Sequence, residues 1–570
     1  MKRGRYVLII ILIFFFLVTA TILAFIYSEF NRPVEIGSAS YLEIGLSGSL
    51  PELAEPDFLT SYFLGGRPVS VHDIWENLRK AKVDSRVRCV LIRLGEIDGE
   101  WAKASELRDA ILDFRRSGKK VYAYIEESSE FDKEYYLATA CDRIILHPLG
   151  WLAVNGIGGW VPFFKKGLDK LGIEAEFEHV EQFKTAYNMF MEKGLTEAHR
   201  TMLESLDRDI LGEYLRTVAA ARKIKEEDFK ALLDQGLFQG EQAKRAGLVD
   251  DVMYDDELLK LLREDGRELE RTSLAEYNRV SPASLGLETG RTVALIYAMG
   301  PIVSGEGYYS TIGARTLSRW IRRAREDRSV AAIVLRVDSP GGSSVGSDDI
   351  WREVFLAKKE KPVVVSMSDL AGSGGYWIAM AAHKIVAQPQ TLTGSIGVIA
   401  GKFSLAGLYE KLGVTAERLT FGRRADMFSS FRPLTADEKR FLKDQILWTY
   451  DRFITKAAEG RTMTKEEVDE VGKGRVWTGR QAKDIKLVDE LGGLTMAIGQ
   501  AKKLAGIPAE EEVSLAVWPK TTSFLGRLFG RPEASVRWPL PADMGKLLTT
   551  LRALEKEGPL SVMPFWLSTQ

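Results

Sequence analysis

Two stretches of this chain repeat each other, and a duplication restricts the possible folds more than any other feature of a sequence. Three pairs of segments match in the same order at an offset near 240 residues, namely 84–93 with 327–336, 135–144 with 376–385, and 239–250 with 478–489. Matches that keep their order at a nearly constant offset indicate two copies of one domain. We place the copies at residues 29–290 and 291–505, followed by a C-terminal tail at residues 506–570.

Each copy alternates short apolar runs with helical stretches. The runs are rich in β-branched residues and lie at 90–94, 120–125, 144–146, 332–337, 362–366 and 385–387. Continuous apolar runs of this length are typical of parallel strands that are buried on both faces, with helices as the crossovers. Residues 200–221 and 436–458 are expected to form longer amphipathic helices on the second half of each copy. The pattern therefore predicts an α/β fold, present twice in tandem.

The N-terminus carries an apolar segment. The 22 residues Tyr6–Tyr27 hold no charged side chain, and about 20 apolar residues suffice to span a hydrocarbon core as a helix. Lys2, Arg3 and Arg5 precede the segment, which favours a cytoplasmic N-terminus and a body on the outer side. A cleaved signal peptide is the alternative, but its apolar region is usually about 7–15 residues long and ends at a small-x-small site. We therefore expect residues 1–28 to be an uncleaved transmembrane anchor.

The charge balance and the cysteine content exclude several classes of function. The chain has 78 basic and 79 acidic residues, whereas nucleic-acid binding calls for a basic patch or stripe. Its two cysteines, Cys89 and Cys141, lie in apolar surroundings and support neither a disulfide framework nor a zinc site. We expect buried structural thiols, no nucleic-acid partner, no metal and no cofactor.

The two copies differ where chemistry is expected. Only the second copy has Asp-Ser-Pro-Gly-Gly at 338–342 directly after a strand, and only the second has the glycine-flanked Ser373, which corresponds to Asp132 in the first. The amide of Gly374 would lie at a helix N-terminus, where it suits developing negative charge. The glycines Gly341 and Gly342 could supply a second amide. Two ordinary glycine turns are the alternative, but their joint presence in one copy and joint absence from the other favour a nucleophile with an oxyanion hole.

A serine nucleophile needs a base, and the residues alone leave that base open. The five histidines do not form a convincing Ser-His-Asp arrangement. Lys184 of the first copy lies opposite Arg423 of the second, and a lysine in an apolar site can lose its proton whereas an arginine cannot. A lone lysine is nevertheless usually a solvated surface charge.

Four motifs resemble the long form of the signal peptide peptidase A family. They are Phe-Lys-Thr-Ala at 183–186, Asp-Ser-Pro-Gly-Gly at 338–342, Ala-Gly-Ser-Gly-Gly-Tyr-Trp at 371–377 and Leu-Thr-Gly-Ser-Ile-Gly at 392–397. The resemblance implies tandem Clp/crotonase-like domains behind an N-terminal anchor, with Ser373 as the nucleophile and Lys184 as the general base. Ser395 is a candidate for orienting the lysine amine, with an ordinary turn serine as the alternative.

The same resemblance carries expectations about biology. It implies a homotetramer in the bacterial cytoplasmic membrane, with an extracytoplasmic body that degrades cleaved signal peptides and other apolar peptides. Two departures put substrate details in doubt, because Gly372 stands where the family commonly has alanine, and residues 187–190 replace a more usual acidic-Pro stretch. Two other readings remain, an acyl-CoA enzyme of the crotonase type and a non-catalytic scaffold. The predicted outer location argues against the first and the intact serine and lysine against the second.

Overall fold

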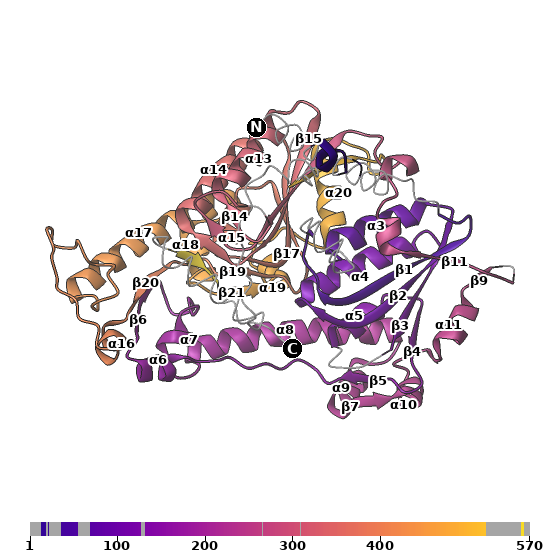
Figure 1. The fold of residues 1–570 in the computed structure, drawn as a ribbon, viewed down its shortest axis with the longest axis horizontal. Helices are drawn as coiled ribbons and strands as arrows, with labels where there is room; N and C mark the ends of the chain where they lie inside the picture. Colours follow the sequence, from indigo (N-terminus) through magenta and orange to yellow (C-terminus); the bar gives the residue numbers. More distant parts are fainter. Residues whose placement is uncertain are drawn as a thin grey trace, which may run out of the picture.

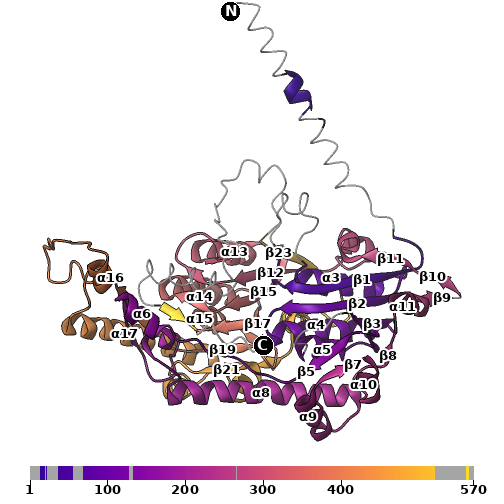
Figure 2. The same cartoon turned by 60° about the horizontal axis from the view of Figure 1, so that its bottom comes forward.

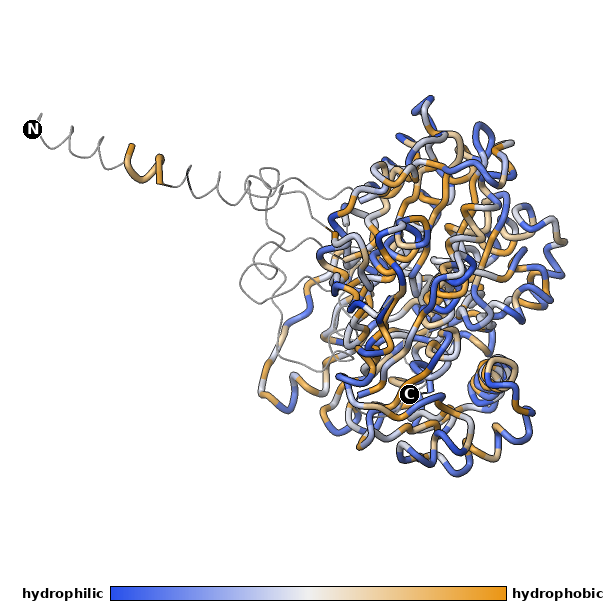
Figure 3. Tube along the Cα trace, turned by 90° about the vertical axis from the view of Figure 1, so that its right-hand side faces the viewer, coloured by the Kyte–Doolittle hydropathy of each residue, from blue (hydrophilic) through white to orange (hydrophobic). Residues whose placement is uncertain are grey.

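The computed structural model describes residues 13–18, 21, 36–54, 69–126, 132–264, 266–307, 309–519 and 560–563. Of the predicted anchor, residues 13–18 and 21 are helical, and residues 13–18 are all apolar (Figure 3). The remainder of that prediction lies outside the described residues. Within the described ranges, no helix has both the length and the apolar character needed to cross a membrane.

The first copy builds a parallel sheet of six strands (Figure 1). Their order across the sheet is β11 (Glu270–Ser273), β1 (Ser40–Ser49), β2 (Val87–Asp98), β3 (Lys120–Ile125), β4 (Arg143–Leu146) and β8 (Asp251–Val252). The inner strands β2, β3 and β4 are the apolar runs that the sequence predicts, and most of their side chains are buried.

The second copy repeats this order strand by strand. Its sheet runs β23 (Ser514–Trp518), β12 (Thr292–Met299), β15 (Val330–Ser339), β17 (Val363–Gly372), β18 (Lys384–Ala387) and β22 (Glu490–Leu491). The C-terminal end of β17 also pairs with β19 (Leu392–Gly394), which in turn pairs antiparallel with β21 (Val476–Thr478). The tandem α/β fold is therefore confirmed, although β23 extends the second sheet beyond residue 505, where we expected the repeat to end.

Helices of matching position cover both sheets. They are α3 (Val71–Val83), α4 (Trp101–Arg115) and α5 (Asp132–Ala138) in the first copy, and α13 (Ala314–Glu326), α14 (Ser344–Lys358) and α15 (Gly374–Ala379) in the second. Both cysteines lie buried in the first copy as free thiols, and burial raises the pKa of each to about 12.

Two long helices, α8 (Glu197–Arg222) and α17 (Ala436–Arg461), occupy equivalent places and each has 26 residues. Each begins after a threonine, Thr196 or Thr435, whose side chain accepts a hydrogen bond from the amide three residues on. Such N-caps satisfy a donor that the first turn leaves free. Helix α8 passes below both sheets (Figures 1 and 2), and its Asp209 accepts a 2.5 Å hydrogen bond from Thr478 of the second copy.

Strand β6 (Glu174–His179) of the first copy also joins the second copy. It pairs antiparallel with β20 (Ile399–Ser404) over six residue pairs. The segment from β6 to the start of α8 is therefore held against the second copy at both ends, and Lys184 lies within it.

The interface between the copies contains two ionic clusters, the first buried and the second partly buried. In one, Arg336 of β15 pairs with Glu52 at 2.8 Å and with Glu106 at 2.9 Å, and all three side chains are at most 2% exposed. In the other, Lys103 of α4 lies 2.9 Å from Asp338 and 3.3 Å from Asp369. Burial by itself lowers the pKa of Lys103, but Asp338 and Asp369 outweigh that effect and raise it.

Candidate active site

Ser373 lies in the tight connection between β17 and α15. Its backbone has φ 54° and ψ −111°, a region that side-chain-bearing residues rarely adopt and that costs on the order of 1–3 kcal/mol. Its amide donates a 2.8 Å hydrogen bond to the Gly394 carbonyl, which fixes the turn. The next residue, Gly374, is the first of α15, so its amide is at a helix N-terminus as the sequence predicts.

The counterpart in the first copy has a different use. Asp132 begins α5, and its carboxylate accepts hydrogen bonds from the amides of Asn155 at 3.1 Å and Gly156 at 3.2 Å. The first copy thus has a carboxylate that hydrogen-bonds the loop at 155–156, at the position where the second copy has the Ser373 hydroxyl.

Backbone contacts from the second copy surround Lys184. The amide of Phe183 donates to the Lys473 carbonyl at 3.2 Å. At Gly474, where φ is +80°, an added Cβ would lie 2.5 Å from the Lys184 amide nitrogen, and at Gly397 it would lie 3.1 Å from Lys184 Cδ. Glycine at 474 and 397 therefore allows the second copy to close over the lysine and exclude water.

The structure brings three of the predicted residues together. Lys184 Nζ lies 2.7 Å from Ser373 Oγ, 3.0 Å from Ser395 Oγ and 2.9 Å from the Ser395 carbonyl oxygen. The side chains of Lys184, Ser373 and Ser395 are all 0% exposed. Ser395 has φ 49°, and its amide donates to the Arg475 carbonyl at 2.7 Å.

Burial lowers the pKa of Lys184 well below its usual value. The hydrogen bonds of its amine within the described residues go to hydroxyl and carbonyl oxygens, and no carboxylate is among them. A buried ammonium without a counter-charge is disfavoured, so the arrangement favours a neutral amine beside a serine hydroxyl. Within the described residues, no histidine hydrogen-bonds to Ser373.

The two glycine motifs also meet. An added Cβ on Gly374 would lie 3.0 Å from Gly341 Cα and 3.1 Å from the Gly342 amide nitrogen, so the loops are in direct contact. Gly341 has φ 97° and Gly342 has φ 155°. The Gly341 amide donates to Ser339 Oγ at 3.2 Å, whereas Gly342 lies in β16 (Gly341–Ser343), a short strand beside β13 (Ile302–Val303). Gly374 and this turn together form the candidate oxyanion-binding site.

Sequence reasoning missed two contributors to the site. Gly397 accepts a 3.3 Å hydrogen bond from Ser373 Oγ through its carbonyl, and Gly474 closes on Lys184. Gly397 ends the quoted motif at 392–397, which was a usable signal. Nothing in the sequence near Gly474 links it to a lysine 290 positions earlier.

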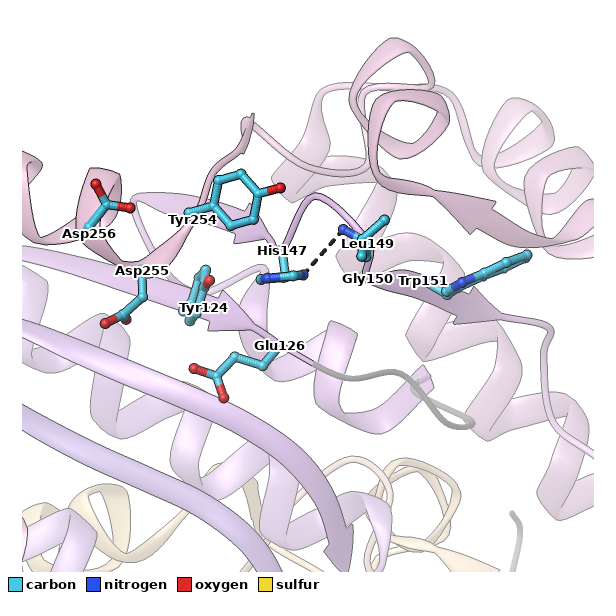
Figure 4. A pocket seen from close by; sticks show the side chains of 9 residues that line it. All are labelled: Tyr124, Glu126, His147, Leu149, Gly150, Trp151, Tyr254, Asp255 and Asp256. Carbon is cyan, nitrogen blue, oxygen red and sulfur yellow. Dashed lines mark hydrogen bonds between the residues drawn. The ribbon is translucent and has the colours of Figure 1, made fainter.

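A separate cavity of ≈ 840 Å³ lies at the carboxyl ends of β3 and β4 in the first copy (Figure 4). Aromatic and acidic residues dominate its lining, among them Tyr124, Trp151 and Tyr254. Two of its carboxylates, Glu126 and Asp255, already pair with Arg93. None of the predicted site residues lines this cavity. The described residues also contain no group of three His, Cys, Asp or Glu side chains that could hold a metal ion.

Comparisons with known proteins place the sequence in a peptidase family. The model of peptidase family S49 matches residues 113–269 and 356–508. The chloroplastic serine protease SPPA of Arabidopsis thaliana is 37% identical over 84% of this chain and 72% of its own length. Protease 4 of Salmonella typhi is 33% identical over 84% of this chain and 78% of its own length. Among solved structures, a ClpP1 mutant from Listeria monocytogenes is 16% identical and covers 36% of this chain and 91% of its own, with a TM-score of 0.23.

Proposed function

The chain belongs to peptidase family S49 and is a serine peptidase, and we propose that Ser373 is its nucleophile and Lys184 its general base. The observation that carries this proposal is the 2.7 Å separation of Lys184 Nζ and Ser373 Oγ in a site where both side chains are fully buried.

The hydrogen bonds of the Lys184 amine orient its lone pair. A neutral amine has two N–H donors and one lone pair. If the donors point to the carbonyl and the hydroxyl oxygen of Ser395, at 2.9 Å and 3.0 Å, the lone pair faces Ser373 Oγ. The single hydroxyl proton of Ser373 then turns from the Gly397 carbonyl, 3.3 Å away, to the amine. Ser395 is thus proposed as the positioning residue that orients the base.

The reaction then follows the usual course of acyl transfer. Lys184 accepts the Ser373 proton while Oγ bonds to the peptide carbonyl carbon, and the resulting oxyanion is held by amides of Gly374 and the Gly341–Gly342 turn. Lys184 returns the proton to the leaving amine as the C–N bond breaks. Water, deprotonated by the same amine, then attacks the ester, and Ser373 is released with its proton restored.

We further propose that the chain is anchored by Tyr6–Tyr27 with its body outside the cytoplasmic membrane, and that it degrades cleaved signal peptides as a homotetramer. The resemblance at 183–186, 338–342, 371–377 and 392–397 and the basic residues before the apolar segment support this. Protease accessibility of the body in spheroplasts tests the orientation, and light scattering of the detergent-solubilised chain tests the assembly.

The test of the chemistry compares four full-length proteins on an apolar fluorogenic peptide and on a serine-reactive fluorophosphonate. The proteins are the parent, Ser373→Ala, Lys184→Met, and Lys260→Met as the matched control, because Lys260 is 59% exposed on α11 (Asp255–Leu261). We expect cleavage and labelling only in the parent and the control. Cleavage by folded Ser373→Ala or Lys184→Met would refute the assignment, and hydrolysis of acyl-CoA without peptide cleavage would favour the crotonase reading.

A further inference from the structure

A piece of the C-terminal tail lies inside the site. Residues Leu560–Val562 form β24, drawn in yellow in Figures 1 and 2. This strand pairs antiparallel with β16, where Gly341 faces Val562, Gly342 faces Ser561 and Ser343 faces Leu560. The amide of the next residue, Met563, donates a 2.8 Å hydrogen bond to the Pro340 carbonyl. The tail therefore runs along the glycine turn assigned above to the oxyanion.

The same strand joins two separate strands of the second copy, β16 and β20. The sheet order is β14 (Ile312–Gly313), β13, β16, β24, β20 and β6, and β24 also pairs with β20 through Leu560 and Ile399. Among the strands that the structure describes in this sheet, β24 alone joins β16 to β20. Without it, each would present an edge of unpaired backbone groups, which readily accepts an extended peptide.

The side chain of Met563 fills the space next to the nucleophile. Met563 is 0% exposed and Leu560 is 2% exposed. A Cβ on Gly372, the residue directly before Ser373, would lie 2.4 Å from Met563 Sδ and 3.2 Å from its Cβ. Glycine at 372 thus makes room for this side chain, at the position where we noted a departure from the alanine that is common in the resembled family.

We propose that Leu560–Met563 is a built-in pseudosubstrate. It occupies the place of a peptide substrate between β16 and β20, with Met563 in the pocket over Gly372, and substrate must displace it. The complete burial of Ser373 agrees with an occupied site, because a nucleophile open to substrate would be accessible. This inference rests on the proposed function, and it adds that the pocket beside Gly372 takes an unbranched apolar side chain.

The test uses the full-length chain with Met563→Asp, which puts a charge into the buried pocket and leaves the catalytic residues unchanged. The matched control is Met496→Asp, because Met496 is 43% exposed on α20 (Leu494–Leu504). Since a tethered segment competes at a high effective concentration, we expect Met563→Asp to lower KM for an apolar peptide roughly tenfold with little change in kcat. A second variant that ends at Gly558 should behave in the same way.

Hydrogen exchange measures, without relying on catalysis, whether the tail occupies the space between β16 and β20. The amides of β16 and β20 should lose protection in Met563→Asp and keep it in Met496→Asp. A synthetic peptide of residues 558–565 should inhibit Met563→Asp competitively, and the same peptide with aspartate in place of its methionine should not. Unchanged exchange and unchanged KM in an active enzyme would overturn the pseudosubstrate. If Met563→Asp loses protection but neither it nor the parent cleaves peptide, the tail does occupy the space between β16 and β20 in the parent. That result would refute the proposed function and not the placement of the tail.

Discussion

Replacing Lys184 by methionine tests whether the lysine is neutral in the folded protein, by a measurement that needs no substrate. The side chain is fully buried, and burial lowers its pKa well below the usual value of 10.5. At any pH between the folded and the unfolded pKa, the unfolded chain therefore binds one proton more than the folded chain. Stability must then rise with pH in that window.

The magnitude follows from this proton count. One proton contributes about 1.4 kcal/mol per pH unit to the free energy of unfolding. The parent gains this amount per unit up to about pH 10.4, and gains nothing more above it because both states are then neutral. Methionine carries no proton, so Lys184→Met lacks this rise. It also loses the hydrogen bonds to Ser373 and Ser395, at about 1 kcal/mol each, but that loss is independent of the charge on the lysine.

The assay is urea unfolding of the full-length parent and Lys184→Met at pH 7, 8, 9 and 10. We expect the difference in unfolding free energy, parent minus variant, to increase by about 1.4 kcal/mol per pH unit over the window. Lys260→Met, an exposed lysine on α11, serves as the control and should give a far smaller slope. Parallel curves for the parent and Lys184→Met would show that the buried lysine keeps its proton on folding, which would refute its proposed role as a base.

Three further substitutions probe the surroundings of the site. Ser373→Gly should abolish turnover. It should also raise the free energy of unfolding by about 1 kcal/mol, because glycine accepts the φ of 54° without strain. A thermal melt that shows destabilisation would contradict the strained turn. Lys103→Met should cost about 3 kcal/mol, because Asp338 and Asp369 lose a mostly buried partner that is 12% exposed. Lys82→Met, at the more exposed pair with Asp113, should cost about 1 kcal/mol or less. Equal losses in thermal unfolding would contradict a larger contribution from the Lys103 cluster. Gly474→Ala should lower kcat at least about tenfold, because its Cβ would lie 2.5 Å from the Lys184 amide nitrogen. The control is Gly247→Ala, which has a similar φ of +74° with open space around it and should keep the parent's kcat. Similar kcat values for the two variants would refute the argument.

The sequence by itself determined the duplication and the α/β class, and it singled out Ser373 as the proposed nucleophile. Strands such as β3, β15 and β17 follow from runs of β-branched residues, because the backbone preference of a segment depends mainly on its own side chains. Ser373 stood out because the second copy has a glycine-flanked serine where the first has Asp132. That comparison needs no knowledge of contacts.

The family resemblance implied Lys184 as the base, but only the tertiary structure shows that its amine lies beside Ser373. Lys184 is 189 positions away, and its low pKa comes from burial by chain segments at Gly397 and Gly474 that no local pattern connects to it. The same holds for β24, which lies in the tail that the sequence left without a role. Desolvation and strand addition depend on which distant segments pack together, and the spacing of residues along a chain does not encode that packing.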